Sequence, residues 1–511
     1  MKKILLLIPL LLLSSTASLP RQSEALRFEV TVAQSVSPES KNGRLFLLFG
    51  KRLSPEPRMT TGNTSLEADP FFARDVTDFT HGKTAIIDDK AVGFPVESLS
   101  RLASGEYYIQ ALFDTNADLK SINSPGNLYS APQPLALDPA RSGAIKIELT
   151  QKIPPEELPP DTQHIKYIKI KSELLSRFHN RPIYLRAGVI LPRDYATDAA
   201  KRFPLRVHIG GYGSRFLNVR ARMLDGAGFR RAWEDKTAPS MILLHLDGDG
   251  PFGDCYQINS ENNGPYGDAI TGELIPYVEK QFRAIGEPWA RVVDGGSTGG
   301  WVSLALQIFY PDFFNGAWSY CPDGVDFRAF QLINIYQDRN AYINRYGFER
   351  PSARDANGDV RFTIRHECRM ENALGAGDSW AMSGEQWGAW NAAYGPRGED
   401  RRPRPLWNPV TGEIDRAVTE HWKKYDLRLI LQQNWNTLGP RLRGKINIWI
   451  GEADDYFLNN AVHLLDAFLS KATPPYEGRI VYGPGKGHCW LSISELEMMK
   501  EMAARIEQSR R

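Results

Sequence analysis

The pattern of apolar and polar positions changes its character once along the chain, near residue 160. Over residues 26–150, short stretches of alternating apolar and polar positions are separated by Gly, Pro, Asn and Asp. Such alternation is typical of half-buried strands that are joined by turns. Strands are expected at residues 26–33, 44–49, 84–87, 105–114 and 144–150. This part of the chain is therefore predicted to be a small all-β sandwich domain.

A proline-rich segment follows this predicted domain. Residues 153–161 read Ile-Pro-Pro-Glu-Glu-Leu-Pro-Pro-Asp. Proline restricts φ and has no N–H to donate, so this segment can form neither a helix nor a central strand. We interpret residues 151–164 as a semi-rigid linker between two domains.

Beyond the linker, strand-like segments alternate with helix-like segments, the latter including residues 272–282 and 302–309. The strands are expected at residues 166–172, 182–191, 204–209, 240–246, 290–294, 315–320, 445–450 and 478–482. This alternation indicates an α/β domain over residues 165–511, with a mostly parallel sheet covered on both faces.

A long insertion follows the sixth expected strand, because the alternation lapses over residues 323–440. Half of the twelve tryptophans lie in this insertion: Trp380, Trp387, Trp390, Trp407, Trp422 and Trp435. The insertion could cover the carboxyl edge of the sheet like a lid, where open α/β sheets bind their ligands. It could equally be a satellite core packed by its tryptophans, and the pattern leaves both interpretations open.

Composition and charge narrow the class of protein. Of the 511 residues, 42% are hydrophobic and 24% are charged, as in globular proteins. The 62 basic and 60 acidic residues give a net charge of +2, which offers no reason to expect nucleic acid or an anionic membrane as partner.

Residues 1–18 have the three parts of a secretory signal peptide: Lys2 and Lys3, an apolar run over residues 4–13, and small residues after it. The apolar run is too short to span a bilayer, and no later segment is long enough either. The sequence thus predicts a soluble exported protein, periplasmic or secreted.

Cysteine spacing says little about pairing. Four cysteines, Cys255, Cys321, Cys368 and Cys489, allow three complete pairings in an oxidising compartment, or they could be free. No C-x-x-C pair is present, and the acidic loop at residues 247–254 lacks EF-hand spacing. That loop is interpreted as pocket wall, and no metal or cofactor is expected.

Ser297 is the strongest candidate for chemistry. It lies in a G-x-S-x-G motif between a strand-like and a helix-like segment, which is the context of a nucleophile elbow. A nucleophile at such a turn has a strained backbone, so small neighbours are needed for the strand and the helix to pack closely. Taken alone, the motif fits a glycine-rich turn with an incidental serine about equally well.

Two later loops offer partners for Ser297 in the order acid, then histidine. Asp454 follows the expected strand at residues 445–450, with Asp455 as the second choice for the acid. His488 lies in a glycine-rich loop after the last expected strand and is the predicted base. The acid would hold the imidazole in the tautomer that accepts the serine proton.

Two backbone N–H groups are expected to bind the oxyanion of the tetrahedral intermediate. One belongs to Thr298, directly after the nucleophile, and the other to Tyr212, in the glycine-rich loop after the third strand. The substrate pocket is expected to include Gly211, Trp301, Trp387 and Trp390.

These motifs together resemble the putative-esterase branch of the α/β-hydrolases, which includes esterase D, feruloyl esterases and enterochelin esterases. The matching segments are Gly210-Gly211-Tyr212-Gly213, Gly264-Pro265-Tyr266-Gly267-Asp268 and Gly295-Gly296-Ser297-Thr298-Gly299-Gly300-Trp301. The resemblance covers about residues 165–325 and 440–500. It implies an α/β-hydrolase fold with Ser297 as nucleophile, Asp454 as acid and His488 as base.

The chain departs from this family pattern in two places. Many members have a large residue at the position of Gly296, so a pocket contact is expected to be missing. The insertion at residues 323–440 matches no characterised member, so the resemblance does not imply a substrate.

We therefore expect an exported serine hydrolase of carboxylesterase type that acts on a small-molecule or carbohydrate-linked ester through an acyl-enzyme. An acyltransferase would use the same triad, and water exclusion at deacylation separates the two activities. The alternative from another class is a non-catalytic protein that binds a carbohydrate or aromatic ligand through its tryptophans. The oligomeric state stays open.

Overall fold

The computed structural model describes residues 25–36, 39–65 and 67–510. The predicted signal peptide at residues 1–18 lies outside the described residues. None of the helices in the described ranges has both the length and the apolar character needed to cross a bilayer.

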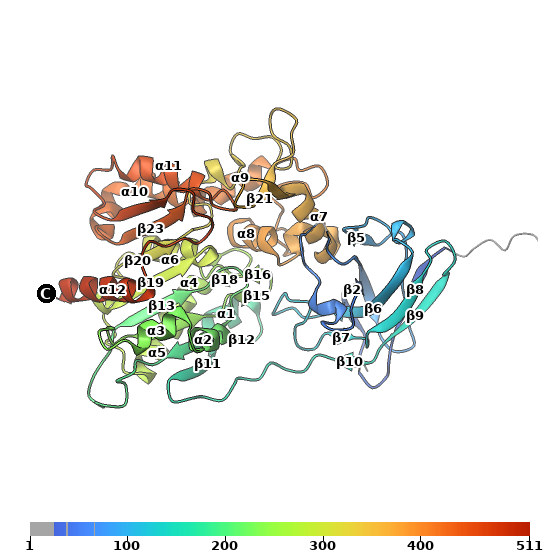
Figure 1. The fold of residues 1–511 in the computed structure, drawn as a ribbon, viewed down its shortest axis with the longest axis horizontal. Helices are drawn as coiled ribbons and strands as arrows, with labels where there is room; N and C mark the ends of the chain where they lie inside the picture. Colours follow the sequence, from blue (N-terminus) through green and yellow to red (C-terminus); the bar gives the residue numbers. More distant parts are fainter. Residues whose placement is uncertain (1–24, 37–38, 66, 511) are drawn as a thin grey trace, which may run out of the picture.

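Two β-sheets form the first part of the chain, on the right in Figure 1. The three-stranded sheet has the order β4 (Ala85–Ile87), β1 (Arg27–Val32), β9 (Ala144–Leu149). The seven-stranded sheet has the order β10 (Gln151–Lys152), β7 (Leu128–Tyr129), β6 (Gly105–Asp114), β2 (Lys41–Gly50), β3 (Phe71–Phe79), β5 (Val92–Phe94), with β8 (Gln133–Leu137) also paired to β6. Both sheets contribute to one apolar cluster that includes Phe28 and Phe49.

The five strands expected in this region correspond to β1, β2, β4, β6 and β9. The sequence analysis missed β3, although it is nine residues long. Its first three residues are buried consecutively and its next positions carry Arg, Asp and Asp, so the alternation of apolar and polar positions is broken. The short strands β5, β7 and β8 offer too few residues for a period to be recognised.

The main sheet has eight strands and is mixed. Its order is β11 (Ile165–Ser172), β12 (Ile183–Ile190), β14 (Ile242–Leu246), β13 (Leu205–Ile209), β19 (Arg291–Gly296), β20 (Ala317–Tyr320), β23 (Ile446–Gly451), β24 (Arg479–Gly483). The pairings of β11 with β12 and of β12 with β14 are antiparallel, and the other five pairings are parallel. All eight expected strands are present.

Helices cover both faces of this sheet (Figure 1). The helices are α1 (Glu173–His179), α2 (Val219–Arg222), α3 (Gly228–Glu234), α4 (Tyr266–Ala269), α5 (Ile275–Gln281), α6 (Thr298–Phe309), α11 (Asn459–Leu469) and α12 (Glu495–Arg510). On β19, Val293 packs in the cluster that contains α6, whereas its neighbour Val292 packs with Met499 and Met502 of α12. Because side chains alternate along a strand, each central strand is buried on both sides.

The insertion between β20 and β23 combines helices, one β-hairpin and irregular segments. It contains the hairpin β21 (Pro351–Arg354) and β22 (Val360–Thr363) and the helices α7 (Ile364–Leu374), α8 (Gln386–Tyr394), α9 (Arg416–Trp422) and α10 (Leu427–Leu442). None of these helices was expected from the sequence, in which the alternation lapses over this range. In α8 every residue from Trp387 to Tyr394 is buried, so the helix has no polar face and no amphipathic period to detect.

The tryptophans of the insertion pack inward. All six are buried, and they belong to the same apolar cluster as Trp301 of α6. Trp380 stacks on Trp407 with ring centroids 4.6 Å apart. The tryptophans therefore pack a core, as one of the two interpretations expected, and this core is continuous with the main core of the sheet.

The seven-stranded sheet also packs against the insertion (Figure 1). Its outer face, with Phe46, Phe71 and Phe94, forms an apolar cluster with Met370 and Leu374 of α7. Arg44 of β2 is buried and donates hydrogen bonds from Nε and Nη2 to the carbonyl oxygen of Ala373, at 3.0 and 2.9 Å. The first part of the chain thus supports a helix that borders the candidate site described next.

Candidate active site

Ser297 lies at a sharp turn between β19 and α6. Its backbone angles, φ 56° and ψ −123°, are outside the regions that L-residues favour. The glycines around it are required sterically, since a Cβ on Gly295 would lie 2.3 Å from the Gly299 carbonyl oxygen. A Cβ on Gly299 would lie 2.1 Å from the Ile209 carbonyl oxygen. The turn therefore has the strained backbone and close packing that a nucleophile elbow requires.

The space beside Gly296 is occupied. A Cβ on Gly296 would lie 2.1 Å from the ring of Tyr320 at the end of β20. The ring of Tyr320 fills this space but does not border the cavity beside Ser297, so the loss of a pocket contact at Gly296 stays a prediction.

His488 and Asp454 are hydrogen-bonded to each other. Nδ1 of His488 lies 2.8 Å from Oδ2 of Asp454, and Asp454 is fully buried in the loop after β23. An ionised carboxylate only accepts hydrogen bonds, so Nδ1 carries the proton and Nε2 is left as the basic nitrogen. Asp455, the second choice for the acid, instead accepts the backbone N–H of His488 at 3.0 Å.

The surroundings of His488 change its basicity. Burial lowers the pKa of the imidazole, but the hydrogen bond to Asp454 and the charges of Asp454, Asp323 and Asp455 outweigh burial. The pKa of His488 is therefore raised above its ordinary value. An imidazole in this environment is a stronger base toward a serine hydroxyl than a free one.

Ser297 and His488 border the same cavity, of about 380 Å³. Tyr212 and Trp390 also border it, together with Phe362 and Met370 from the insertion. The insertion therefore covers the site while also extending the core. Gly62 and Thr64, from the first part of the chain, complete one wall.

Two of the expected pocket tryptophans do not border this cavity. Trp301 is fully buried and packs edge-on against Tyr256. Trp387 is buried as well, and its Nε1 donates a hydrogen bond to Glu367 at 2.8 Å. Assigning them to the pocket was wrong, because their large apolar rings fill the core beneath it.

The two N–H groups expected at the oxyanion lie near Ser297. A Cβ on Gly211 would be 3.6 Å from Cβ of Ser297, so the loop that precedes Tyr212 passes directly beside the nucleophile. Among the described residues, the N–H of Tyr212 donates to no acceptor. Thr298 is the first residue of α6, where an N–H has no partner within the helix. Both donors are therefore free to bind a ligand.

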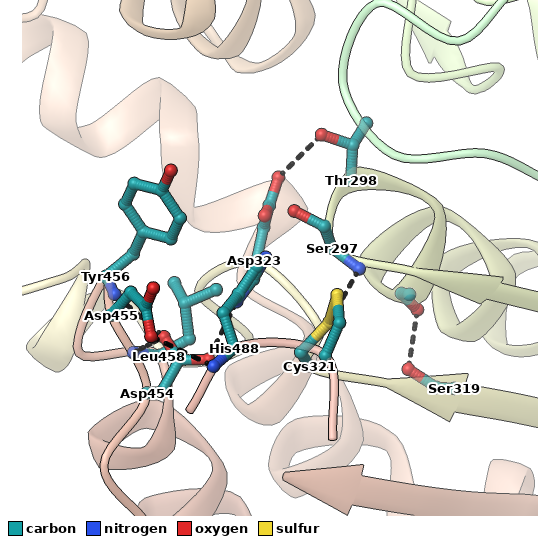
Figure 2. The surroundings of a disulfide bond; sticks show 12 residues. Ser297, Thr298, Ser319, Cys321, Asp323, Asp454, Asp455, Tyr456, Leu458 and His488 are labelled. Atoms are coloured by element: carbon teal, nitrogen blue, oxygen red, sulfur yellow. Dashed lines mark hydrogen bonds and ion pairs between the residues drawn. A yellow bond between two sulfur atoms is a disulfide. The ribbon is translucent and has the colours of Figure 1, made fainter. Parts of the chain in front are cut away.

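A disulfide joins Cys321 to Cys489, next to the elbow (Figure 2). Cys489 directly follows His488, and Cys321 follows β20. The backbone N–H of Ser297 points at the Cys321 sulfur at 3.2 Å and also donates to the Tyr320 carbonyl oxygen at 3.0 Å. The two sulfurs and a ring nitrogen of His488 lie within 4.8 Å of one another. The disulfide thus ties the histidine loop to the elbow.

The other two cysteines are not paired. Cys255 and Cys368 are buried with free thiols. The sequence could not choose a pairing, because Cys321 and Cys489 are 168 residues apart and meet only through the order of strands in the sheet.

Sequence reasoning missed four acidic residues that border the cavity: Asp323, Glu367, Glu371 and Glu385. Asp323 lies three residues past the end of β20 (320 to 323), just as Asp454 lies three residues past the end of β23 (451 to 454). This shared position after a strand was the available signal. Glu367 and Glu385 lie in the insertion, where no sequence pattern placed them near Ser297.

The acidic loop at residues 247–254 lies elsewhere. Gly248, Asp249 and Asp254 border a neighbouring cavity of about 370 Å³, which shares Tyr212 and Glu385 with the first one. The loop is therefore pocket wall, as expected, but of the cavity that adjoins the one beside Ser297.

The geometry can now be compared with known proteins. A family model described as putative esterase matches residues 185–469, which is more than half of the chain. The chain therefore belongs to the putative esterase family and has the α/β-hydrolase-like fold of that family. By class it is a serine hydrolase that acts on carboxylic esters.

Individual relatives are distant. No curated protein matches this chain. Among solved structures, a ferulic acid esterase is 15% identical, covering 68% of this chain and 98% of its own with a TM-score of 0.36. An S-formylglutathione hydrolase from Agrobacterium tumefaciens is 11% identical (68% and 95% covered, TM-score 0.34). Fluorophosphonate-binding serine hydrolase F from Staphylococcus aureus is 14% identical (67% and 99% covered, TM-score 0.37). The family assignment rests on the family model and not on these likenesses.

Proposed function

We propose that this protein is an exported carboxylesterase-type hydrolase that uses Ser297, His488 and Asp454 as a catalytic triad. Nε2 of His488 takes the proton of the Ser297 hydroxyl as the serine oxygen attacks the ester carbonyl. Asp454 holds the Nδ1–H of the imidazole and stabilises the imidazolium that forms. The N–H groups of Tyr212 and Thr298 bind the oxyanion.

The acyl-enzyme is then cleaved by water. The imidazolium gives its proton to the leaving alcohol, and the regenerated imidazole activates a water molecule that attacks the acyl-serine. The nucleophile, the base, the acid and the oxyanion donors of this mechanism all belong to this chain.

The observation that carries the proposal is the bond between His488 Nδ1 and Asp454 Oδ2, 2.8 Å long, beside a cavity that Ser297 and His488 both border. The three residues lie in the loops that follow β19, β23 and β24. The first of these strands begins at residue 291 and the last at residue 479, which is 188 residues later. Such convergence of a nucleophile, a base and an acid supports acyl transfer to water.

We further propose the domain boundaries that the sequence suggested. Residues 26–150 would form a β-sandwich domain, residues 151–164 a linker, and residues 165–511 the catalytic domain with residues 323–440 as its lid. The apolar cluster shared by the two first sheets supports the sandwich. The cavity residues Glu367, Gln386 and Trp390 support the role of the insertion as a lid.

Replacing Ser297 tests the triad. Ser297→Ala is expected to lower hydrolysis of short p-nitrophenyl esters by at least about 10³-fold, because no other group supplies the nucleophile. Labelling with a fluorophosphonate probe should be lost as well. Circular dichroism and thermal unfolding check that the variant is folded.

Ser303→Ala is the matched control. Ser303 lies on α6, the helix that follows Ser297. It is buried and donates a hydrogen bond to the Gly300 carbonyl oxygen, away from the cavity. It should keep both turnover and labelling. Turnover by folded Ser297→Ala equal to that of the unmodified protein would overturn the proposed triad. Export is tested separately, by sequencing the N-terminus of the protein recovered outside the cytoplasm.

A further inference from the structure

The cavity beside Ser297 contains a buried carboxyl group with one oxygen unused by the protein. Asp323 is only 2% exposed. Its Oδ2 accepts hydrogen bonds from Tyr256 at 2.6 Å, Trp390 at 3.0 Å and Thr298 at 3.2 Å. Its Oδ1 accepts no hydrogen bond from the described residues. Figure 2 shows this carboxyl group beside the Ser297 hydroxyl, with the bond to Thr298 dashed.

Two glutamates repeat this arrangement. Glu367 uses only Oε2, which accepts from Ser352 at 2.5 Å and from Trp387 at 2.8 Å. Glu385 also uses only Oε2, which accepts from the Tyr212 hydroxyl at 3.2 Å. Within the described ranges, the Oε1 atoms of both residues lack a donor. Glu371, by contrast, has donors for both of its oxygens.

No basic side chain balances these groups inside the cavity. Apart from His488, its wall contains no Lys, Arg or His among the described residues. Lys120, whose charge reaches Glu385, borders the neighbouring cavity instead. Burial raises the pKa of Asp323 and of Glu367, and it raises that of Glu385 to about 7. Holding these carboxyl groups ionised without a cation is unfavourable.

A ligand with a positive charge would remove this cost. A hydroxyl group would supply hydrogen bonds but no charge, and an anion would be repelled by all three carboxyl groups. Aromatic rings also border the cavity, namely those of Phe362, Trp390 and Tyr456. The faces of aromatic rings attract cations, and most strongly for tryptophan.

We propose that this cavity selects esters in which the acyl or the alcohol group carries a positively charged nitrogen, bound by Asp323, Glu367 and Glu385. This inference rests on the proposed function, since it names the substrate class of the same site. Asp323 lies beside Ser297 and binds a substrate nitrogen that is close to the ester bond. The two glutamates bind a substrate nitrogen that is farther along the cavity wall.

Two matched series of esters test the proposal. The first compares butyrylthiocholine with its uncharged isostere 3,3-dimethylbutyl thiobutyrate and with the anion S-butyryl-3-mercaptopropionate. The second compares p-nitrophenyl esters of 6-(trimethylammonio)hexanoate, 7,7-dimethyloctanoate and adipate. In at least one series, kcat/KM for the cation should exceed that of the isostere by at least about tenfold, and the anion should be slower than the isostere.

Variants assign this preference to the carboxyl groups. Asp323→Asn should lower the ratio of cation to isostere by about tenfold, measured in each protein on the alkaline plateau of its pH profile, where kcat/KM no longer changes with pH. Glu385→Gln, at a less buried position, should lower the same ratio and serves if Asp323→Asn fails to fold. Asp249→Asn is the control. Asp249 borders the neighbouring cavity, and its Oδ2 lies 3.5 Å from Nη1 of Arg215. Its ratio should stay unchanged.

The outcomes separate this inference from the proposed function. Hydrolysis that depends on Ser297 but shows no preference for the cation in either series would overturn the cationic substrate class alone. Equal losses for all esters in Asp323→Asn, with the ratio unchanged in Glu385→Gln too, would also overturn it and assign Asp323 to supporting His488. No hydrolysis or labelling at all by the folded protein would overturn the proposed function.

Discussion

At the scale of single residues, the candidate site depends on how His488 is surrounded. Its imidazole is bonded to Asp454 and faces the further negative charges of Asp323 and Asp455. These charges favour the protonated ring, which raises its pKa against the opposing effect of burial. The same charges would stabilise the imidazolium that forms during attack.

The pH dependence of hydrolysis should report this raised pKa. Neutral His488 is the base, so kcat/KM should fall as the pH drops through the pKa of the free enzyme, above the ordinary value of 6.5. In Asp454→Asn, the residual activity should be roughly 10³ to 10⁴-fold lower, and its acid limb should move to lower pH because a negative charge is gone. Profiles of kcat/KM for a neutral p-nitrophenyl ester measure both effects. An acid limb that stays in place would show that Asp454 does not act on the titrating group.

At the scale of elements, the site depends on bonds between strand ends. The disulfide holds the loop after β24 to the loop after β20, so the position of His488 relative to Ser297 does not rely on hydrogen bonds alone. Beneath the elbow, Arg206 of β13 and Asp294 of β19 form a buried pair with two bonds, at 2.7 and 2.8 Å. His208 donates to the same carboxylate at 2.8 Å.

Removing the disulfide should lower kcat more than it changes KM. In Cys321→Ser/Cys489→Ser, His488 keeps its bond to Asp454 but loses its covalent link to the elbow, and small misplacements cost roughly 10 to 100-fold. The unfolding free energy should fall by about 2–4 kcal/mol, since the bond closes a loop of 168 residues. Steady-state kinetics and denaturant unfolding measure the two effects. Reduction of the disulfide by a dithiol should lower kcat in the unmodified protein as well. The control variant Cys255→Ala/Cys368→Ala keeps the disulfide, so a dithiol should lower its kcat to the same extent. If a dithiol no longer lowered kcat in this variant, the loss would come from the free thiols and not from the disulfide.

Breaking the buried pair should destabilise the fold. Asp294→Ala leaves Arg206 buried with Glu495 as its remaining acidic partner, so unfolding should become easier by about 3–5 kcal/mol. Asp312→Ala removes an exposed partner of Arg441 and should cost less than about 1 kcal/mol. Urea unfolding of both variants compares the two pairs. Equal, small effects would mean that the buried ion pair adds little to the backbone pairing and apolar packing of β13 and β19.

At the scale of the whole molecule, the first part of the chain and the insertion build the cavity together. The seven-stranded sheet packs on α7, and α7 supplies Glu367 and Met370 to the cavity wall. Gly62 and Thr64 add a second contact from the same part of the chain. The sheets are therefore expected to shape substrate binding without touching the reacting atoms.

Loosening this contact should affect KM. Arg44→Ala leaves the Ala373 carbonyl oxygen and the Asp75 and Asp378 carboxylates without this donor. Unfolding should become easier by about 1.5–3 kcal/mol, and KM should rise several-fold with a smaller change in kcat. Arg74→Ala, on the neighbouring strand β3, removes a bond to the Ile86 carbonyl oxygen only and should leave KM unchanged. Equal KM values in both variants would show that α7 does not depend on the sheet.

Much of the fold could be predicted from local signals. All eight strands of the main sheet were expected, because each is a short apolar run or, as in β11, a short alternating one. Ser297 was expected at the elbow because its glycines are needed for close packing, and Asp454 and His488 because they follow strands in the order typical of α/β-hydrolases. Helix α8 of the insertion was not predictable in the same way, since a helix buried on all sides shows no period.

The sequence by itself thus determined the strands of the main sheet, the elbow and the order of the candidate triad, because strand periodicity and glycine sterics act between residues close along the chain. Only the tertiary structure decided which cysteines pair, that Trp301 and Trp387 lie in the core, and that Asp323, Glu367 and Glu385 meet at one cavity. These are contacts between residues far apart in the sequence. They depend on which strands become neighbours in the sheet and on how the insertion folds over its edge, and no local pattern contains that information.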